Sequence, residues 1–243
     1  MIELEHLRKT FGPNVAVDDL CLVVKSGEIF AFLGPNGAGK TTTIKILAGL
    51  LKPTSGRACI HGLDVVRDGL KARALMSYVP DEPYLYEKLT AREFLRLIGD
   101  LYGLPREKTE ARIASVSATF ELAEYIDHLT ESFSHGMKQR TVLAAALLHD
   151  PRVLVIDEPM VGLDPRSART VKDLLKDLAR KQGVTIFMST HMLSVAEELA
   201  DRVGILHRGK LIALGTLPEI SQHKTLNGGA VGLEDVFLEL TEE

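Results

Sequence analysis

Residues 29–41 read IFAFLGPNGAGKT, an apolar run that ends directly in a glycine-rich loop. The apolar run predicts a buried strand, and GKTTTIKILAGL, residues 39–50, predicts a helix. Between them, GPNGAGKT (34–41) matches the pattern G-x-x-x-x-G-K-[ST], whose glycines let backbone N–H groups close around phosphates at a helix N-terminus. A glycine-rich turn that matched by chance would lack the flanking strand and helix. The stretch therefore predicts a phosphate-binding loop in an α/β protein.

The side chains of this loop predict a nucleotide and a metal ion. Lys40 would reach the β- and γ-phosphates, and the Thr41 hydroxyl would bind Mg²⁺. The loop by itself leaves the reaction open. The predicted phosphate-binding residues are Gly34, Pro35, Asn36, Gly37, Ala38, Gly39, Lys40, Thr41 and Thr42.

A second signal is VLVIDEP, residues 153–159, in which four apolar residues lead to two acids. The carboxyl ends of strands are the usual ligand position in open α/β sheets. Asp157 would hold Mg²⁺ through its water shell, and Glu158 would act as general base on the attacking water. The alternative for this segment alone is a strand end capped by solvated acids, which the phosphate-binding loop disfavours.

Two histidines follow comparable local patterns. His191 ends FMSTH, again after an apolar strand, and would lie near a γ-phosphate if the two strands are neighbours; a structural histidine is the alternative. In FSHGMKQR (133–140), Ser134 and His135 begin a helix. A nucleophile–base pair is the weaker interpretation because no acid stands close in sequence. Ser134 as an N-cap, with its helix end exposing N–H groups to an anion, is the stronger one.

The order of the predicted elements defines the fold class. Short strands dominate the first third, residues 90–149 are mainly helical with Thr90 as N-cap and Pro105 at a helix start, and α/β alternation then returns, with a hairpin at 208–209. We predict an α/β P-loop NTPase core with a mainly parallel sheet, an N-terminal antiparallel β subdomain and an inserted α-helical subdomain. The predicted single domain (1–243) comprises the nucleotide-binding core with its β subdomain (1–89 and 150–220), the helical subdomain (90–149) and a C-terminal tail (221–243).

Composition excludes several function classes. The formal charge of −4 and aromatic content of 5% disfavour a nucleic-acid binder. No apolar run approaches the ~18 residues of a membrane-spanning helix, and the N-terminus has no signal-peptide pattern. Cys21 and Cys59 lie in apolar strand-like segments, which predicts buried free thiols in a reducing cytosol, with a disulfide as the alternative.

These motifs together resemble the ATP-binding subunit of an ABC transporter. FSHGMKQR resembles the family's Leu-Ser-Gly-Gly signature (Ser134, His135 and Gly136), VGLDP its D-loop with Asp164, and STH its switch histidine. Phe11 falls where the family stacks an aromatic ring on adenine. The resemblance implies ATP and Mg²⁺ as ligands and a head-to-tail dimer with a second ATP-binding subunit, in which the signature serves the partner's nucleotide. It also implies a location at the inner face of the cell membrane through an integral membrane permease.

Two positions depart from the family pattern. Asp81 stands where the family usually has a glutamine that touches Mg²⁺; it could still ligate the metal but adds negative charge near the γ-phosphate. His135 replaces the first signature glycine and would crowd a close backbone approach. Both changes affect the expected rate of hydrolysis more than the binding of ATP. A catalytically weak regulatory subunit of a heterodimer therefore stays an alternative, as does a soluble ABC ATPase that is not linked to transport.

The C-terminal stretch GLEDVFLELTEE, with IKILAGLLKPTSG earlier in the chain, resembles the ATPases of ABC-2-type exporters. An ordinary terminal helix that packs Val236, Phe237 and Leu240 against the core is the alternative for that stretch. We expect an ATPase subunit that drives a separate permease, and the sequence leaves open whether it works as a homodimer or a heterodimer.

Overall fold

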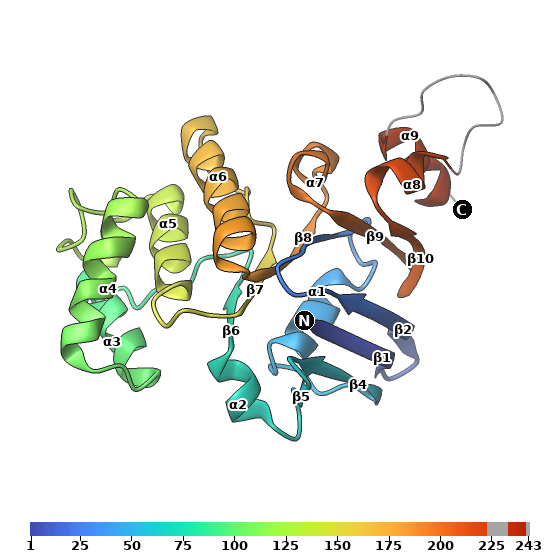
Figure 1. The fold of residues 1–243 in the computed structure, drawn as a ribbon, viewed down its shortest axis with the longest axis horizontal. Coiled ribbons are helices and arrows are strands. Elements are labelled where there is room, and N and C mark those ends of the chain that lie inside the picture. Colours follow the sequence, from blue (N-terminus) through green and yellow to red (C-terminus); the bar gives the residue numbers. More distant parts are fainter. Residues whose placement is uncertain (223–232, 242–243) are drawn as a thin grey trace.

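The computed structural model describes residues 1–222 and 233–241, and two β-sheets organise it (Figure 1). The larger sheet has the strand order β10-β9-β3-β8-β7-β6, and the smaller has the order β2-β1-β4-β5. The larger sheet consists of β3 (Ile29–Leu33), β6 (Met76–Val79), β7 (Val153–Asp157), β8 (Thr185–Thr190), β9 (Arg202–His207) and β10 (Lys210–Gly215). The smaller sheet consists of β1 (Ile2–Phe11), β2 (Asn14–Val24), β4 (Ser55–Ile60) and β5 (Leu63–Asp64).

The larger sheet is parallel from β6 to β9, and only β10 runs antiparallel, returning through the predicted hairpin. Its register determines where the strands end. Leu33 pairs with Thr190, and Asp157 pairs with Ser189. The carboxyl ends of β3, β7 and β8 therefore meet at one edge, where parallel sheets place their ligands.

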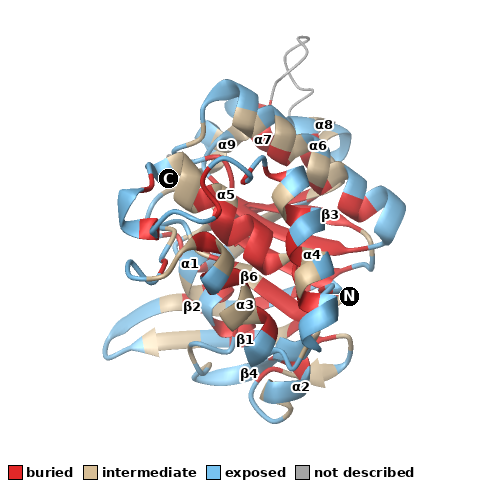
Figure 2. Ribbon diagram, turned by 90° about the vertical axis from the view of Figure 1, so that its left-hand side faces the viewer, coloured by how far each residue is buried: buried red, intermediate tan, exposed pale blue. Residues whose placement is uncertain are grey.

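Helices cover the parallel sheet, and side-chain alternation divides the core between its two faces. Phe30, Phe32 and Phe187 pack together in one hydrophobic cluster, with Phe30 and Phe187 stacked at a centroid distance of 5.5 Å. Their strand neighbours Ala31 and Met188 belong to the second cluster. Buried residues accordingly concentrate along the sheet and the helix surfaces that face it (Figure 2). The helices outside residues 90–149 are α1 (Lys40–Leu47), α2 (Gly69–Ala74), α6 (Pro165–Gln182), α7 (Leu193–Leu199), α8 (Leu217–Gln222) and α9 (Leu233–Thr241).

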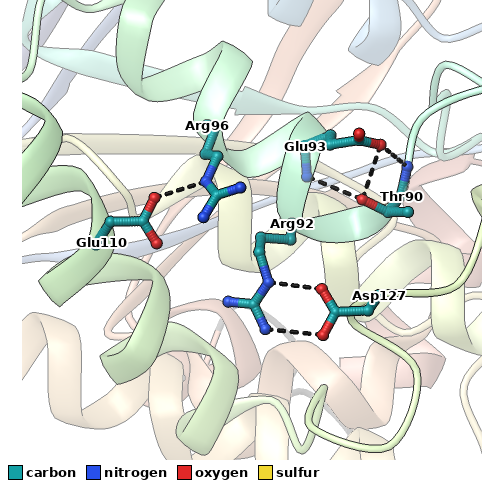
Figure 3. A network of polar contacts seen from close by, with 6 residues as sticks. All are labelled: Thr90, Arg92, Glu93, Arg96, Glu110 and Asp127. Carbon is teal, nitrogen blue, oxygen red and sulfur yellow. Dashed lines mark hydrogen bonds and ion pairs between the residues drawn. The ribbon is translucent and has the colours of Figure 1, made fainter.

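Residues 90–149, called here the helical region, contain α3 (Ala91–Leu101), α4 (Arg106–Thr119), the short 3-10 helix η1 (Thr130–Ser132) and α5 (His135–Ala146). The region lies at the end of the molecule away from the antiparallel sheet (Figure 1). Thr90 is the predicted N-cap, and Thr90 and Glu93 form a capping box. Arg92 donates twice to Asp127, at 2.6 and 3.0 Å, and Arg96 donates to Glu110 (Figure 3).

The predicted fold class is confirmed: a mainly parallel P-loop core, an antiparallel N-terminal sheet and an inserted helical region. The prediction for Cys21 was wrong. Cys59 is buried, but Cys21 is exposed, because strand alternation turns its neighbours Leu20 and Leu22 into the core and Cys21 outward. Both thiols are free. Leu101, at the end of α3, is 72% exposed, although it continues the helical spacing of the buried residues Phe94 and Leu95.

The described part of the C-terminal stretch forms a helix that packs on the core, as expected of a terminal helix, and this packing is compatible with the resemblance to exporter ATPases. In α9, Val236 is buried, and Phe237 and Leu240 pack against the main core. The residues of the predicted tail at 223–232 and 242–243 lie outside the described residues. Within the described part of the chain, no helix is both long and apolar enough to cross a membrane.

Candidate nucleotide site

The phosphate-binding loop connects β3 to α1, and backbone contacts determine its shape. Gly39 is the N-cap of α1 and has a φ of 108°, a conformation that side chains disfavour. A Cβ atom at this position would lie 2.3 Å from the carbonyl oxygen of Ala16 in β2. Only glycine fits this position, so the N-terminal sheet lies against the loop directly.

Lys40 is held inside the loop. It is 7% exposed, and its Nζ donates hydrogen bonds to the carbonyl oxygens of Gly34, at 2.6 Å, and Pro35, at 3.1 Å. Burial lowers the pKa of Lys40, and the negative charges of Glu158 and Asp157 act in the opposite direction. Burial has removed water from the Lys40 ammonium, and an anionic ligand can replace the lost hydration by binding to it directly.

Asp157 has one carboxylate oxygen in use and one that is unused. The Ser189 hydroxyl donates to Oδ1, whereas Oδ2 is buried and has no hydrogen-bond partner among the described residues. A buried acceptor of this kind requires an explanation, and a cation is the simplest one for a carboxylate that is 2% exposed. Thr41 and Asp81 line a cavity that Asp157 also lines. Two carboxylates and one hydroxyl are oxygen ligands that suit Mg²⁺, which usually keeps several of its water ligands in protein sites.

Glu158 is fixed by the residues that follow β8. Its Oε1 accepts from the backbone N–H of His191, at 3.1 Å, and lies 2.8 Å from His191 Nδ1. Its Oε2 accepts from the Thr190 hydroxyl at 3.2 Å. Glu158 also has a φ of 51°, which is uncommon outside glycine and clusters at functional sites. The carboxylate is thus positioned from three directions at the carboxyl end of the sheet.

A cavity of about 210 Å³ joins these groups. Larger hollows occur elsewhere, including one of about 500 Å³ that Arg112, Phe120 and Leu178 help to line, so chemistry rather than size identifies the site. The cavity brings together loop residues with all three predicted metal ligands and the predicted general base. It is lined by Ala16, Asn36, Gly37, Ala38, Gly39, Lys40, Thr41, Thr42, Asp81, Asp157 and Glu158.

The residues of the signature-like segment are not among those lining residues. Ser134 is the N-cap of α5, as predicted, since its Oγ accepts from the backbone N–H of Met137 at 3.3 Å. No hydrogen bond joins Ser134 to His135 among those of the described residues. The His135 ring instead lies against Gly162, where a Cβ atom would come within 2.0 Å of its Cδ2. Gly136 lies in the first turn of α5, near the Gly162 carbonyl oxygen.

Asp164 and Phe11 also lie outside the residues that line the cavity. Asp164 caps α6, because its Oδ1 accepts from the backbone N–H groups of Arg166 and Ser167. Bonding to Ser167 lowers the pKa of Asp164. Phe11 ends β1 and is 49% exposed, and Lys9 Nζ lies 4.9 Å from the centre of its ring. An exposed, flat ring of this kind can accept a stacking partner.

Sequence reasoning missed four residues of the site. Ser189 and Thr190 donate to Asp157 and Glu158, and Ala16 contributes a carbonyl oxygen behind the loop. Tyr78 in β6 is half-buried, and burial together with the charges of Asp157 and Asp81 raises its pKa to about 12. The polar pair in FMSTH signalled the first two, because a buried strand that ends in two hydroxyls requires partners. The other two depend on strand order, which the sequence does not show.

Comparison with known proteins agrees with this geometry. A sequence profile of the ABC transporter family matches residues 17–161. The probable multidrug ABC transporter ATP-binding protein YbhF of Escherichia coli (strain K12) is 42% identical over 216 residues, 89% of this chain and 37% of that protein. The linearmycin resistance ATP-binding protein LnrL of Bacillus subtilis (strain 168) is 36% identical over 244 residues, 98% of this chain and 78% of that protein. The chain thus spans little more than a third of the length of YbhF.

Two solved structures are similar over most of this chain. An ATP-binding subunit of an ABC transporter has a TM-score of 0.91 and 35% identity, with 99% of both chains covered. A dimeric post-hydrolysis state of the ATP-binding cassette MJ0796, bound to ADP and Pi, has a TM-score of 0.82 and 28% identity, with 89% of this chain and 99% of that chain covered. The chain belongs to the ABC transporter family and is an ATP-binding domain of that family.

Proposed function

We propose that this chain binds Mg²⁺-ATP, hydrolyses it to ADP and phosphate, and so powers a separate membrane permease, of the ABC-2-type exporter class. The observation that carries the proposal is the grouping of Lys40, Asp157 and Glu158 around one cavity behind a phosphate-binding loop. Membership of an ATPase family supports ATP as the nucleotide, and the relatives named for multidrug transport and linearmycin resistance support export.

Each residue has a distinct part in the proposed reaction. Loop N–H groups and Lys40 bind the β- and γ-phosphates and neutralise charge as the bond to the bridging oxygen breaks. Glu158 orients the attacking water and accepts its proton while the water oxygen bonds to the γ-phosphorus. His191 contacts Oε1 of Glu158, and in the proposed reaction it also contacts the γ-phosphate, although it is not among the residues that line the cavity. Thr41, Asp157 and Asp81 would hold Mg²⁺, which would neutralise negative charge on the phosphates.

We further propose that the protein functions as a head-to-tail dimer with a second ATP-binding subunit. In this arrangement Ser134, His135 and Gly136 contact the nucleotide of the partner, and Phe11 stacks on adenine in its own chain. The proposal is supported by the dimeric MJ0796 relative and by the separation of the α5 N-terminus from the residues that line the cavity. A permease would hold the dimer at the inner face of the cell membrane.

Asp81 favours a second candidate, a regulatory subunit that binds ATP but hydrolyses it slowly. Three carboxylates, those of Asp81, Asp157 and Glu158, line a single small cavity. Negative charges that lie close together repel one another, and a bound γ-phosphate would add further negative charge to this cavity. If this effect dominates, nucleotide binding is retained and turnover is low.

One experiment tests the proposed function and separates the two candidates. Steady-state phosphate release by the full chain should be Mg²⁺-dependent and should fall by roughly 10²–10⁴-fold in Glu158→Gln, the usual contribution of a general base. ATP binding should be retained in that variant. Glu110→Gln is the matched control, because its carboxylate only pairs with Arg96 in the helical region.

Normal release by Glu158→Gln would contradict the assigned base. Low release by both the wild-type protein and Glu158→Gln, with ATP still bound, would favour the regulatory subunit.

A further inference from the structure

A second group of metal-ligating side chains lies on the N-terminal sheet, in a part of the chain that the nucleotide site does not use. His6 in β1 and Asp19 and Cys21 in β2 are all exposed, and one ligand atom from each lies within 4.8 Å of the others. His6 Nδ1 is 2.8 Å from Asp19 Oδ1 and 3.7 Å from Cys21 Sγ. Imidazole, carboxylate and thiolate are the three kinds of side-chain ligand found in protein zinc sites.

Two β-bulges produce this convergence. Leu4 pairs with Leu22 and Leu7 with Leu20, so β1 has one extra residue between these pairs. The next interval, from Leu7 to Lys9, has its extra residue on β2 instead. A bulge bends its strand and redirects a side chain. The two opposed bulges lie on either side of one buried leucine pair.

The residues at the bulges have an unusual backbone conformation that aims their side chains together. His6 has a φ of 46° and Asp19 a φ of 53°. Histidine and aspartate tolerate this region better than most residues, but it remains uncommon and is found at functional positions. β4 accommodates the bulge with Gly56, where a Cβ atom would lie 2.1 Å from the His6 carbonyl oxygen. Three strands therefore cooperate in this one arrangement.

The neighbouring charges are already paired with one another. Arg57 binds Glu5 through two nitrogens, each at 2.7 Å, and Arg8 binds Asp18 at 2.6 Å. Among the described residues, Asp19 has its ion pair with His6 alone. The carboxylate and a Cys21 thiolate would together balance the two charges of a divalent cation, with the imidazole neutral.

We propose that His6, Asp19 and Cys21 form a surface site for Zn²⁺ that links β1 to β2. Zinc bond lengths of about 2.0–2.3 Å give tetrahedral ligand–ligand separations of roughly 3.3–3.6 Å. The two separations from His6 Nδ1, 2.8 Å and 3.7 Å, lie on either side of these values, and the ligand atoms of Asp19 and Cys21 lie within 4.8 Å of each other, so side-chain rotation can complete the site. A thiolate excludes Mg²⁺ and Ca²⁺ as the preferred ions. Three protein ligands leave one position for water, and the site is independent of the nucleotide.

Cobalt(II) added to untagged, reduced, nucleotide-free full-length protein tests this site. Tetrahedral Co²⁺ bound to a thiolate absorbs visibly, and Zn²⁺ should displace it with a stoichiometry of one per chain. Cys21→Ser should abolish the thiolate-to-cobalt band, and Cys59→Ser, which changes the buried thiol of neighbouring β4, should keep it. His6→Asn retains a residue that tolerates positive φ and should lower Zn²⁺ affinity by at least about 10-fold, as should Asp19→Asn, because even indirect partners of a metal contribute that much.

The absence of the band from the wild-type protein would overturn the proposal, and so would a band that persists in Cys21→Ser. Zn²⁺ should also raise the melting temperature of the wild-type protein and of Cys59→Ser but not that of Cys21→Ser, because a ligand that binds only the folded state stabilises it. Melting without metal verifies that each variant is folded. Equal zinc shifts in all three proteins would also overturn the assignment.

Discussion

The nucleotide site and the helical region differ in how completely their polar side chains are paired with one another. At the edge of the parallel sheet, Lys40 is buried in its own loop, and Asp157 has a buried oxygen without a partner among the described residues. In the helical region, the guanidinium of Arg92 and the carboxylate of Asp127 complete two hydrogen bonds with each other, and Thr90 and Glu93 satisfy each other's backbone (Figure 3). Polar groups paired in this way need no ligand, whereas those at the sheet edge do.

One helix of the helical region departs from this pattern. On α5, the amide of Gln139 is fully buried, and neither of its polar atoms has a hydrogen-bond partner among the described residues. Ser134 and His135 begin the same helix. Incomplete polar satisfaction therefore occurs in the two parts of the molecule proposed to contact nucleotide. Unpartnered buried polar atoms also occur at Tyr125, His149 and His207, so among the described residues this property alone does not identify a functional residue.

The largest effect on nucleotide affinity is expected from Lys40→Ala. This change removes the buried cation from the phosphates, and charged hydrogen bonds contribute ~1.5–3 kcal/mol each. Nucleotide affinity, measured by titration calorimetry, should fall by about tenfold or more. Lys45→Ala on the exposed side of α1 is the control and should bind normally. If both variants bound nucleotide with equal affinity, Lys40 would not be a nucleotide-binding residue, and the proposed difference between the nucleotide site and the helical region would lose its main support.

An intermediate effect is expected at the contact between the helical region and the sheet. His149 stacks on Tyr102 with ring centres 3.6 Å apart, and its Nε2 donates to the Met76 carbonyl oxygen at 3.2 Å. Its Nδ1 is buried without a partner among the described residues. Burial lowers the pKa of His149 to about 4, and the hydrogen bond to Met76 acts in the opposite direction. The ring is therefore neutral in the folded protein.

The sign of the pH dependence follows from this shift. Between the ordinary pKa of about 6.5 and about 4, the unfolded chain binds the proton and the folded chain does not. The free energy of unfolding should thus fall as pH is lowered through this window, by about 1–3 kcal/mol. His149→Phe keeps the stacking and removes the titration, so its denaturant midpoints should decline less. Parallel curves for both proteins would show that this contact is not titrated.

The smallest effect is expected from His135→Gly. The His135 ring lies against Gly162, beside the D-loop-like segment, and would crowd a nucleotide at the helix end. Removing it should raise phosphate release by no more than about fivefold, which corresponds to about 1 kcal/mol of activation free energy. The rate should be compared at saturating ATP, with Glu158→Gln as the background control. An unchanged rate would group His135 with the structural polar residues of the helical region.

Local patterns predicted most of the fold because they depend on neighbouring residues. The Thr90 cap, the hairpin at 208–209 and the start of α5 at Ser134 each follow from short-range hydrogen bonds and turn chemistry. The exposure of Cys21 was missed because an apolar segment does not show which of its faces is buried. Leu101 is exposed despite its helical spacing, because periodicity does not indicate where the packing partners of a helix end.

The sequence by itself determined the phosphate-binding loop, the two acids at the end of β7 and His191, because glycine spacing and apolar runs specify local conformation wherever the segment lies. Only the tertiary structure decided that β8 lies next to β7 in the sheet. This adjacency brings Ser189 into hydrogen-bond contact with Asp157 and His191 into contact with Glu158. The tertiary structure alone also places His6, Asp19 and Cys21 close together. Contacts between segments far apart in the chain depend on strand order and on register shifts of a single residue, and packing of the whole core selects both.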